Sequence, residues 1–367
     1  MPRPDPNNPA FEGAARAWLQ EAVGMLPQLL EDLGAARATL TLPDEGLRLS
    51  ADADLARVSS PVVRRWLDAL AQPAARGDLL ARLPPGAMFY ASGSAALDPL
   101  RATMNLAAMG AARALVPSTR MTATESTVLR TAVSALFAQD RVAGATSAGI
   151  DEQGRYWNVS LLELSTPGLQ FVANARQLLA ACRRPLVARA IRADHQVDPM
   201  RWTVAAAPRL PRGSLYVRVP PGQFLWSGLV REMAGDMSRH AMEVLLVPDG
   251  PRVWYVVAPD ALARYRAATA EHPPAASVPT VAGDGTVAVV ALPPLSASMI
   301  FPGDAQFRRN LGGLLQRSPD HGATPITLRL AESARGDGAR FSVRAEVPRS
   351  VLGIVGQVMS SLQGGRP

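Results

Sequence analysis

Four segments of the chain share one arrangement, which limits the fold more than any other feature of the sequence. In each segment, two stretches that alternate apolar and polar residues flank a turn containing aspartate and glycine. The segments begin near residues 38, 142, 242 and 324, and their turns are Asp44–Gly46, Asp151–Gly154, Asp249–Gly250 and Asp337–Gly338. A period of two is typical of a half-buried strand, and an Asp–Gly turn reverses the chain tightly. The sequence therefore predicts four β-hairpins.

Each predicted hairpin is followed by a proline and a predicted helix. The prolines are Pro61, Pro167, Pro259 and Pro348. Proline fits the first position of a helix because its φ is preset and its missing N–H is not needed there. Single strands at "AMFYASGS", "SLYVRVPP" and "TVAVVALPP" follow the first three helices, and further helices are predicted over 95–116, 222–239 and 304–316.

These elements define a unit of hairpin, helix, strand and helix that occurs about three and a half times. An amphipathic stretch over residues 10–36, with Leu33 among its apolar residues, predicts one more helix at the start. We therefore expect an α+β fold, with a largely antiparallel sheet covered by helices on one face and arranged as two pseudo-equivalent halves. The halves span residues 10–200 and 201–363, and residues 1–9 and 364–367 are expected to be disordered.

Charge and residue usage exclude several chemistries. The chain has 367 residues and a net charge of +7, and all of its basic residues are arginines. Without lysine there is no Schiff base and no phosphate-loop lysine. The arginines are scattered rather than clustered, so we expect no nucleic-acid partner. A diffuse positive surface remains compatible with polyanions or anionic membranes.

The single cysteine and the N-terminal segment bear on compartment. Cys182 excludes an internal disulfide framework and lies on an apolar helix face, so we interpret it as a small core residue. No stretch reaches the length of a membrane span, and the sequence as written shows no signal peptide. We expect the cell envelope or periplasm if an export signal is missing from this version, and the cytoplasm otherwise.

Catalytic and metal-binding motifs were not found. The four histidines lack metal-ligand spacing, and no serine-hydrolase elbow or phosphate loop occurs. The best local cluster is Asp194, His195 and Asp198, which has the chemistry of a metal site or a general base, although a polar loop is the preferred interpretation. Ser94 is interpreted as a helix N-cap. We expect no cofactor.

Tryptophans recur at similar places in the predicted units, which favours core anchors over a stacking platform. The four that recur are Trp66, Trp157, Trp226 and Trp254. On the predicted helix over 222–239, Met233 and Met237 line one face, and core packing is preferred there over a ligand groove.

Two phrases separated by 127 residues, "RLPPGAMFY" and "RLPRGSLYV", each precede a predicted strand. We interpret Leu83–Gly86 and Leu210–Gly213 as structural entries to equivalent strands. These phrases, and the hairpins that end in a proline-led helix, resemble uncharacterised bacterial cell-envelope repeat proteins of the DUF3352-like group and its myxobacterial relatives. The resemblance implies an exported or lipid-anchored protein and no catalytic residues.

Together these observations favour a non-enzymatic binding or scaffolding module of the bacterial cell envelope, acting through its sheet face or the groove between its halves. The partner would be a protein or a hydrophobic ligand. A carrier of a hydrophobic small molecule or lipid in a sheet–helix cavity is the first alternative. A hydrolase built around Asp194, His195 and Asp198 is the second.

Overall fold

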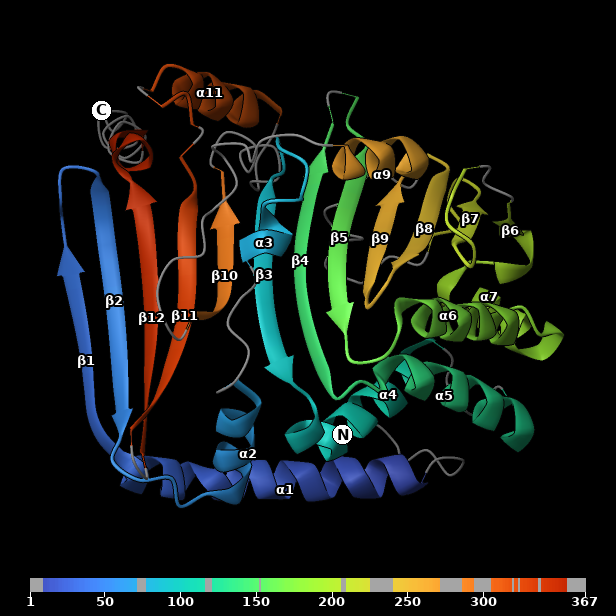
Figure 1. Cartoon of the computed structure of the whole chain (residues 1–367), viewed down its shortest axis with the longest axis horizontal. Coiled ribbons are helices and arrows are strands. Elements are labelled where there is room, and N and C mark those ends of the chain that lie inside the picture. Colours follow the sequence, from blue (N-terminus) through green and yellow to red (C-terminus); the bar gives the residue numbers. More distant parts are fainter. Residues whose placement is uncertain are drawn as a thin grey trace, which may run out of the picture.

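The chain forms one antiparallel sheet of twelve strands in the computed structural model (Figure 1). The structure describes residues 9–70, 77–115, 121–151, 153–205, 209–224, 240–270, 286–293, 305–318, 320–322, 324–335 and 338–354. The strand order is β1-β2-β12-β11-β10-β3-β4-β5-β9-β8-β7-β6. The expected α+β fold with a largely antiparallel sheet is confirmed.

The strands are β1 (Leu33–Thr41), β2 (Gly46–Leu55), β3 (Phe89–Ala96), β4 (Arg141–Ile150), β5 (Tyr156–Leu164), β6 (Thr203–Val204), β7 (Leu215–Val219), β8 (Met242–Asp249), β9 (Arg252–Ala258), β10 (Thr286–Leu292), β11 (Ile326–Arg335) and β12 (Gly338–Pro348). The α-helices are α1 (Pro9–Asp32), α2 (Pro61–Leu70), α3 (Gly77–Leu80), α4 (Arg101–Leu115), α5 (Ala123–Phe137), α6 (Gly168–Cys182), α7 (Pro185–His195), α9 (Ala261–Thr269) and α11 (Ala305–Gln316). Short 3₁₀ helices, η1 (Asp98–Leu100) and η3 (Pro199–Arg201), lie between them, and a further helix begins at residue 349.

All four predicted hairpins are present, as the pairs β1–β2, β4–β5, β8–β9 and β11–β12. In the second turn the Asp151 carboxylate accepts hydrogen bonds from the backbone N–H groups of Gln153 and Arg155. Gly154 and Gly250 adopt the left-handed φ that these turns require. Local alternation and turn chemistry were therefore sufficient to predict the hairpins.

The two similar phrases both lead into strands, as expected. Gly86 and Gly213 have positive φ, and β3 and β7 begin within three residues of them. Leu83 is buried in the core beside α3, and Leu210 packs against the same cluster. The leucine thus anchors the segment, and the glycine turns it into the sheet.

Several sequence predictions about helix ends were wrong. The helix predicted over 10–36 ends at Asp32, and Leu33 begins β1, because pairing with β2 outweighs the helix propensity of this alanine-rich segment. Ser94 is a buried residue inside β3 and caps no helix. Among the four prolines, only Pro61 opens its helix. Pro167 is the N-cap of α6, whereas Asp260 rather than the preceding proline caps α9.

Three further helix predictions differ from the structure or lie largely outside its described residues. Pro348 is the last residue of β12, and the helix that follows is described only to Ile354. The predicted 95–116 helix is shorter, since β3 extends to Ala96 and α4 begins at Arg101. The predicted helix over 222–239, with Met233, Met237 and Trp226, lies mostly outside the described residues.

The two faces of the sheet follow from the register, because residues paired across antiparallel strands point to the same side. One row, on what we call face A, runs through Tyr216, Leu245, Val256, Val159, Ser147, Tyr90, Ala291, Thr327, Glu346, Arg48 and Thr41. The matching row on face B runs through Leu215, Leu246, Tyr255, Ser160, Thr146, Ala91, Val290, Leu328, Ala345, Leu49 and Leu40.

Helices cover both faces of the sheet from β3 to β8, rather than the single face expected. On face A, α3 and α9 pack on the main core cluster, which contains Tyr90, Val159 and Trp254. On face B, α6 packs on β8 and β9 through Val172. Over the middle of β1, β2, β12 and β11, Figure 1 shows no described helix, whereas at the end near α1 Leu67 of α2 packs with Leu55 of β2 and Ala339 of β12.

Strands from opposite ends of the chain alternate in the sheet. The hairpin β1–β2 pairs with β12, and β3 pairs with β10. Residues from the predicted first half, 10–200, and second half, 201–363, therefore interleave in one sheet. Residues 1–8 and 355–367, which include the predicted tail, lie outside the described part of the chain.

The predicted core residues have mixed outcomes. Trp157 and Trp254 are buried, as expected. Trp66 is 42% exposed, so its assignment as a core anchor was wrong. Cys182 is buried at the end of α6, and burial raises the pKa of its thiol to about 12. This agrees with a core residue rather than a nucleophile.

Candidate binding surface

An open apolar patch lies on face B of β1, β2, β11 and β12, beyond the end of these strands where Leu67 of α2 packs with Leu55 and Ala339. It is formed by Leu40, Leu49, Leu328 and Val343, whose exposed fractions are 62%, 43%, 47% and 39%. The four residues come from β1, β2, β11 and β12 and lie in two neighbouring rows of the sheet. Sequence alternation placed each of them on the apolar side of its own strand, and the strand pairing brings these sides onto one face, which is exposed rather than half-buried.

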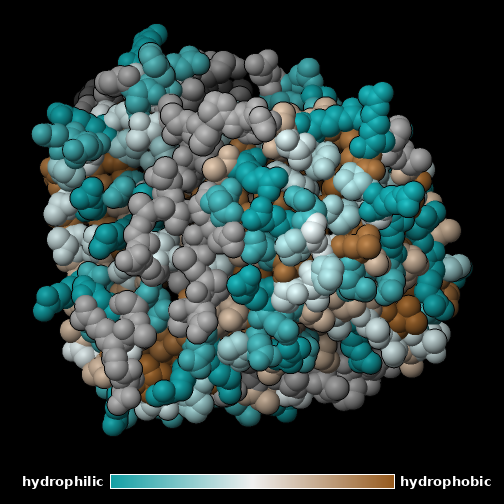
Figure 2. Space-filling view, in the orientation of Figure 1, coloured by the Kyte–Doolittle hydropathy of each residue, from teal (hydrophilic) through white to brown (hydrophobic). Residues whose placement is uncertain are grey.

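The reverse side of these strands, on face A, is polar. Arg340 lies 3.4 Å from Asp52 and 3.7 Å from Asp54, and Arg48 donates to Glu346 at 3.2 Å. Hydrophilic side chains are also seen along the left border of the molecule, where β1 and β2 lie (Figure 2). Exposed pairs of this kind stabilise little and keep this side in contact with water. The patch therefore belongs to a sheet with one polar and one apolar open face.

An apolar hollow of about 340 Å³ adjoins the patch. It is lined by Leu70, Gly93, Ser94, Ala95, Val142, Gly144, Ala288 and Leu330. Gly93 pairs with Gly144 across β3 and β4. Because glycine has no side chain, the surface of face B is recessed at this pair. Leu330, on its rim, pairs directly with Val343 of the patch. The patch and the hollow are consequently parts of one continuous apolar surface.

A hydroxyl-and-amide cluster lies next to the hollow on face B. The Asn158 side-chain amide donates to Thr146 Oγ1 at 2.8 Å, Thr146 and Ser160 hydroxyls lie 2.7 Å apart, and Ser160 donates back to Asn158 Oδ1. Thr146 is two residues from Gly144 along β4. These groups satisfy one another, which makes a polar boundary between the hollow and the core under α6.

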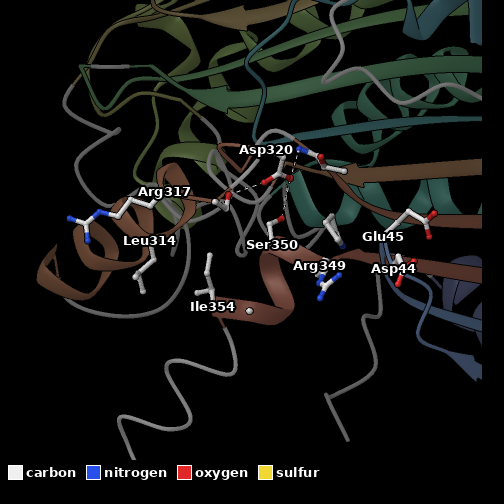
Figure 3. Close-up of a pocket in the computed structure, with 12 residues that line it drawn as sticks. Asp44, Glu45, Leu314, Arg317, Asp320, Arg349, Ser350 and Ile354 are labelled. Atoms are coloured by element: carbon white, nitrogen blue, oxygen red, sulfur yellow. Dashed lines mark hydrogen bonds between the residues drawn. The ribbon is translucent and has the colours of Figure 1, made fainter.

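A second, more polar pocket, shown in Figure 3, lies beside α11, at the end of the strands opposite α1 in Figure 1. Its volume is about 880 Å³, and its lining includes Asp44, Glu45, Leu314, Arg317, Asp320, Arg349, Ser350 and Ile354. The Asp320 carboxylate accepts hydrogen bonds from Ser318 Oγ, Gly322 N, Thr324 N and Ser350 Oγ. It thereby fastens the loop after α11 to the helix that follows β12.

These hydrogen bonds set the acidity of Asp320. Burial alone would raise its pKa, but the donors outweigh that effect and lower the pKa from 3.8 to about 2. Each carboxylate oxygen of Asp320 accepts two hydrogen bonds from other groups of the protein, which is the arrangement of a structural anchor. The pattern "SPDHGAT" shows a turn in the sequence but not its partner Ser350, thirty residues away.

We expect Asp320→Asn to lower the free energy of unfolding by about 1–2 kcal/mol at pH 7. Because the folded pKa is depressed, the carboxylate stabilises the fold above about pH 4, and that contribution is lost as the pH falls towards 2. Urea unfolding followed by circular dichroism between pH 2 and pH 7 checks this. The exposed Asp44→Asn variant serves as the control, and a difference between Asp320→Asn and wild type that does not change with pH would contradict the assignment.

The predicted cluster around His195 is placed at the end of α7. His195 Nε2 lies 2.9 Å from the carbonyl oxygen of Leu115, at the end of α4. Asp198 accepts from Met200 N at 3.1 Å as the cap of η3, and it forms an ion pair with Arg192. These contacts of His195 and Asp198 connect α4, α7 and η3, and a hydrolytic role for the set with Asp194 remains a prediction.

Within the described ranges, no group of three or more histidine, cysteine, aspartate or glutamate side chains is arranged to hold a metal ion. The helices in that same part of the chain are too short or too polar to cross a bilayer. No protein-family model, no curated protein and no solved structure matches the chain. The surface itself therefore carries the argument about function.

Proposed function

We propose that the chain is a non-enzymatic binding or scaffolding module that holds its partner on the open apolar patch and the adjoining hollow. The observation that carries this proposal is the exposure of Leu40, Leu49, Leu328 and Val343 in adjacent rows of one sheet face. Soluble proteins rarely leave a contiguous apolar surface of this kind uncovered, and such surfaces mark interaction sites.

The energetic argument rests on burial. Completely burying a leucine or valine side chain stabilises by about 1.5–3 kcal/mol, so covering the exposed part of each of these four contributes about 1 kcal/mol. The hollow adds a concave anchor point beside Leu330. A partner that covers both parts gains several kcal/mol from apolar contact alone, without a charged group on the patch.

A carrier of a hydrophobic small molecule is the second candidate, and the hollow favours it. Its volume of about 340 Å³ lies at the lower end of the range typical for ligand sites. Its walls are almost wholly apolar, and the hydroxyl cluster of Thr146 and Ser160 lies close by. A lipid-like molecule with one polar end has the chemistry to fit this combination.

One experiment addresses both candidates. A photoreactive benzoylphenylalanine is introduced at Val343, on face B, or at Arg344, the next residue and on face A, and the producing cells are irradiated. We expect an adduct at position 343 and little at position 344. The mass of the adduct separates a protein partner from a small molecule, because only the former shifts the chain by many kilodaltons.

The Leu49→Gln variant supplies the specificity control, since Leu49 lies on the neighbouring strand of the patch. We expect it to reduce the adduct at position 343 several-fold while leaving the circular dichroism spectrum unchanged. Equal adducts at 343 and 344, or none at 343, would remove the proposal that face B is the binding surface.

We also infer that the four hairpins belong to one repeated unit and that the protein works in a bacterial cell envelope. The equivalent entries to β3 and β7 through Gly86 and Gly213 support the repeat. The cell-envelope assignment rests on the resemblance carried by the same phrases. Membrane fractionation of cells expressing the full gene, compared with a cytoplasmic marker, tests the location, and co-purification with that marker would refute it.

A further inference from the structure

The two edges of the sheet differ greatly. β6, at one edge, has only two residues, which is a common way to blunt an edge against further pairing. β1, at the other edge, has nine residues, all but one of them exposed, and contains no proline. A bulge near Leu33 disturbs only its first residues. In Figure 1 it forms the free left border of the molecule. β1 therefore presents an open ladder of backbone donors and acceptors.

The strand order indicates that this border is a strand position left empty. In the block β3-β4-β5-β9-β8-β7, two hairpins lie side by side and a single strand flanks each of them. In the block β10-β11-β12-β2-β1, the same two-hairpin arrangement occurs, and β10 flanks one hairpin. The place beside β1, which corresponds to that of β7 beside β8, holds no described strand.

We propose that β1 of a second copy of this chain occupies this place, so that two sheets join antiparallel across a two-fold axis. An isologous contact of this type needs an edge that is complementary to itself. The face B side chains of β1 are the small Ala36 and Ala38, followed by the larger Leu40. With Thr39 on the axis, each Leu40 lies opposite the small Ala38 of the other copy.

Charge complementarity selects the register. Arg37 is the one charged residue of β1, and pairing it with itself would place like charges opposite each other. Moving the axis to Thr39 or Leu40 brings Arg37 towards the turn of the other copy, which carries Asp44 and Glu45. All three side chains are exposed, and none forms an ion pair with another described residue. The two-fold axis makes this favourable contact twice.

The joined edge would also extend the open apolar patch from one copy into the next, because a two-fold axis perpendicular to the sheet keeps both B faces on the same side. The inference does not depend on the proposed function, since edge pairing uses backbone groups and the patch uses side chains. Measurements on the purified protein alone test the edge pairing, whereas photo-cross-linking at Val343 in cells tests binding of a partner on the patch.

Sedimentation equilibrium of the full chain provides the first test. We expect a dimer with a dissociation constant of about 10 µM or tighter. Arg37→Glu and Glu45→Arg should each weaken dimerisation about tenfold, and the double variant Arg37→Glu/Glu45→Arg should restore it. A monomer at about 100 µM would overturn the proposal. If the double variant dimerises as weakly as the single variants, the proposed register of the two β1 strands is wrong.

Disulfide trapping provides the second test. Single cysteines are placed at positions 38, 39, 40 and 41, and Cys182 can stay because it is buried. Across a two-fold axis, a cysteine on the axis meets its own copy at a distance suited to a disulfide. We expect the fastest cross-linking at position 39 or 40. Arg344→Cys, also exposed but two strands further in, is the control, and cross-linking at 39 and 40 no faster than at 344 would refute the paired edge.

Discussion

Gly168→Ala is expected to lower the free energy of unfolding by about 2–3 kcal/mol. A Cβ atom at this position would lie 2.3 Å from the carbonyl oxygen of Arg252 and 3.1 Å from that of Gly250. Both contacts are with backbone, which a side-chain rotation cannot relieve. The Gly168 N–H also donates to Gly250 O at 2.9 Å, so α6 cannot move away without losing that bond. Urea unfolding followed by circular dichroism measures the loss.

Gly313→Ala is the matched control. Gly313 lies inside α11, and a Cβ atom there would meet nothing within 4 Å. The same substitution should therefore stabilise this helix, by up to about 1 kcal/mol, because alanine has the better helix propensity. If both variants are destabilised equally, the effect of Gly168→Ala does not come from the contact with the β8–β9 turn.

Trp254→Ala is expected to have the largest effect of any single truncation, about 3–5 kcal/mol. Trp254 is 1% exposed and lies at the centre of the main core cluster. Its ring meets the edge of Tyr265 with 6.1 Å between centroids, and the Arg82 guanidinium lies 5.2 Å from the ring centre. Its removal leaves a cavity between the sheet and α9 that rigid strands cannot close. Thermal unfolding by circular dichroism measures the change.

Trp66→Ala separates this effect from the general loss of a tryptophan. Trp66 belongs to the short helix α2 and is 42% exposed. Its truncation should lower the free energy of unfolding by only about 1 kcal/mol. Similar losses for the two variants would mean that Trp254 is not the anchor of the core between the sheet and α9.

The local parts of the fold were predictable because their causes are local. Alternation and the Asp–Gly turns are sufficient to predict each hairpin, and β8 and β9, with continuous apolar runs, are buried as such runs indicate. The strand order was not predictable in this way. It depends on contacts such as Ala53 with Phe341, between residues that no local pattern connects. The same long-range pairing turns the end of the predicted first helix, from Leu33 onward, into β1.

The candidate surface was predictable only in part. The sequence places Leu40 and Leu49 on one side of their strands, but their exposure depends on where helices pack, which is a property of the whole sheet. The hollow needs Gly93 opposite Gly144, and their alignment follows from the register of β3 and β4. A glycine inside each predicted strand was the available signal.

The pairing of β2 with β12 has a consequence for how the protein is made. The first hairpin leaves the ribosome early, whereas β12 begins at residue 338, about 280 residues later. At 5–20 residues per second, β2 waits roughly 15–60 s for its neighbour. During that time both edges of the hairpin are unpaired and its leucines are uncovered. A nascent chain of this topology is thus a natural client for a chaperone that holds strands apart until synthesis is complete.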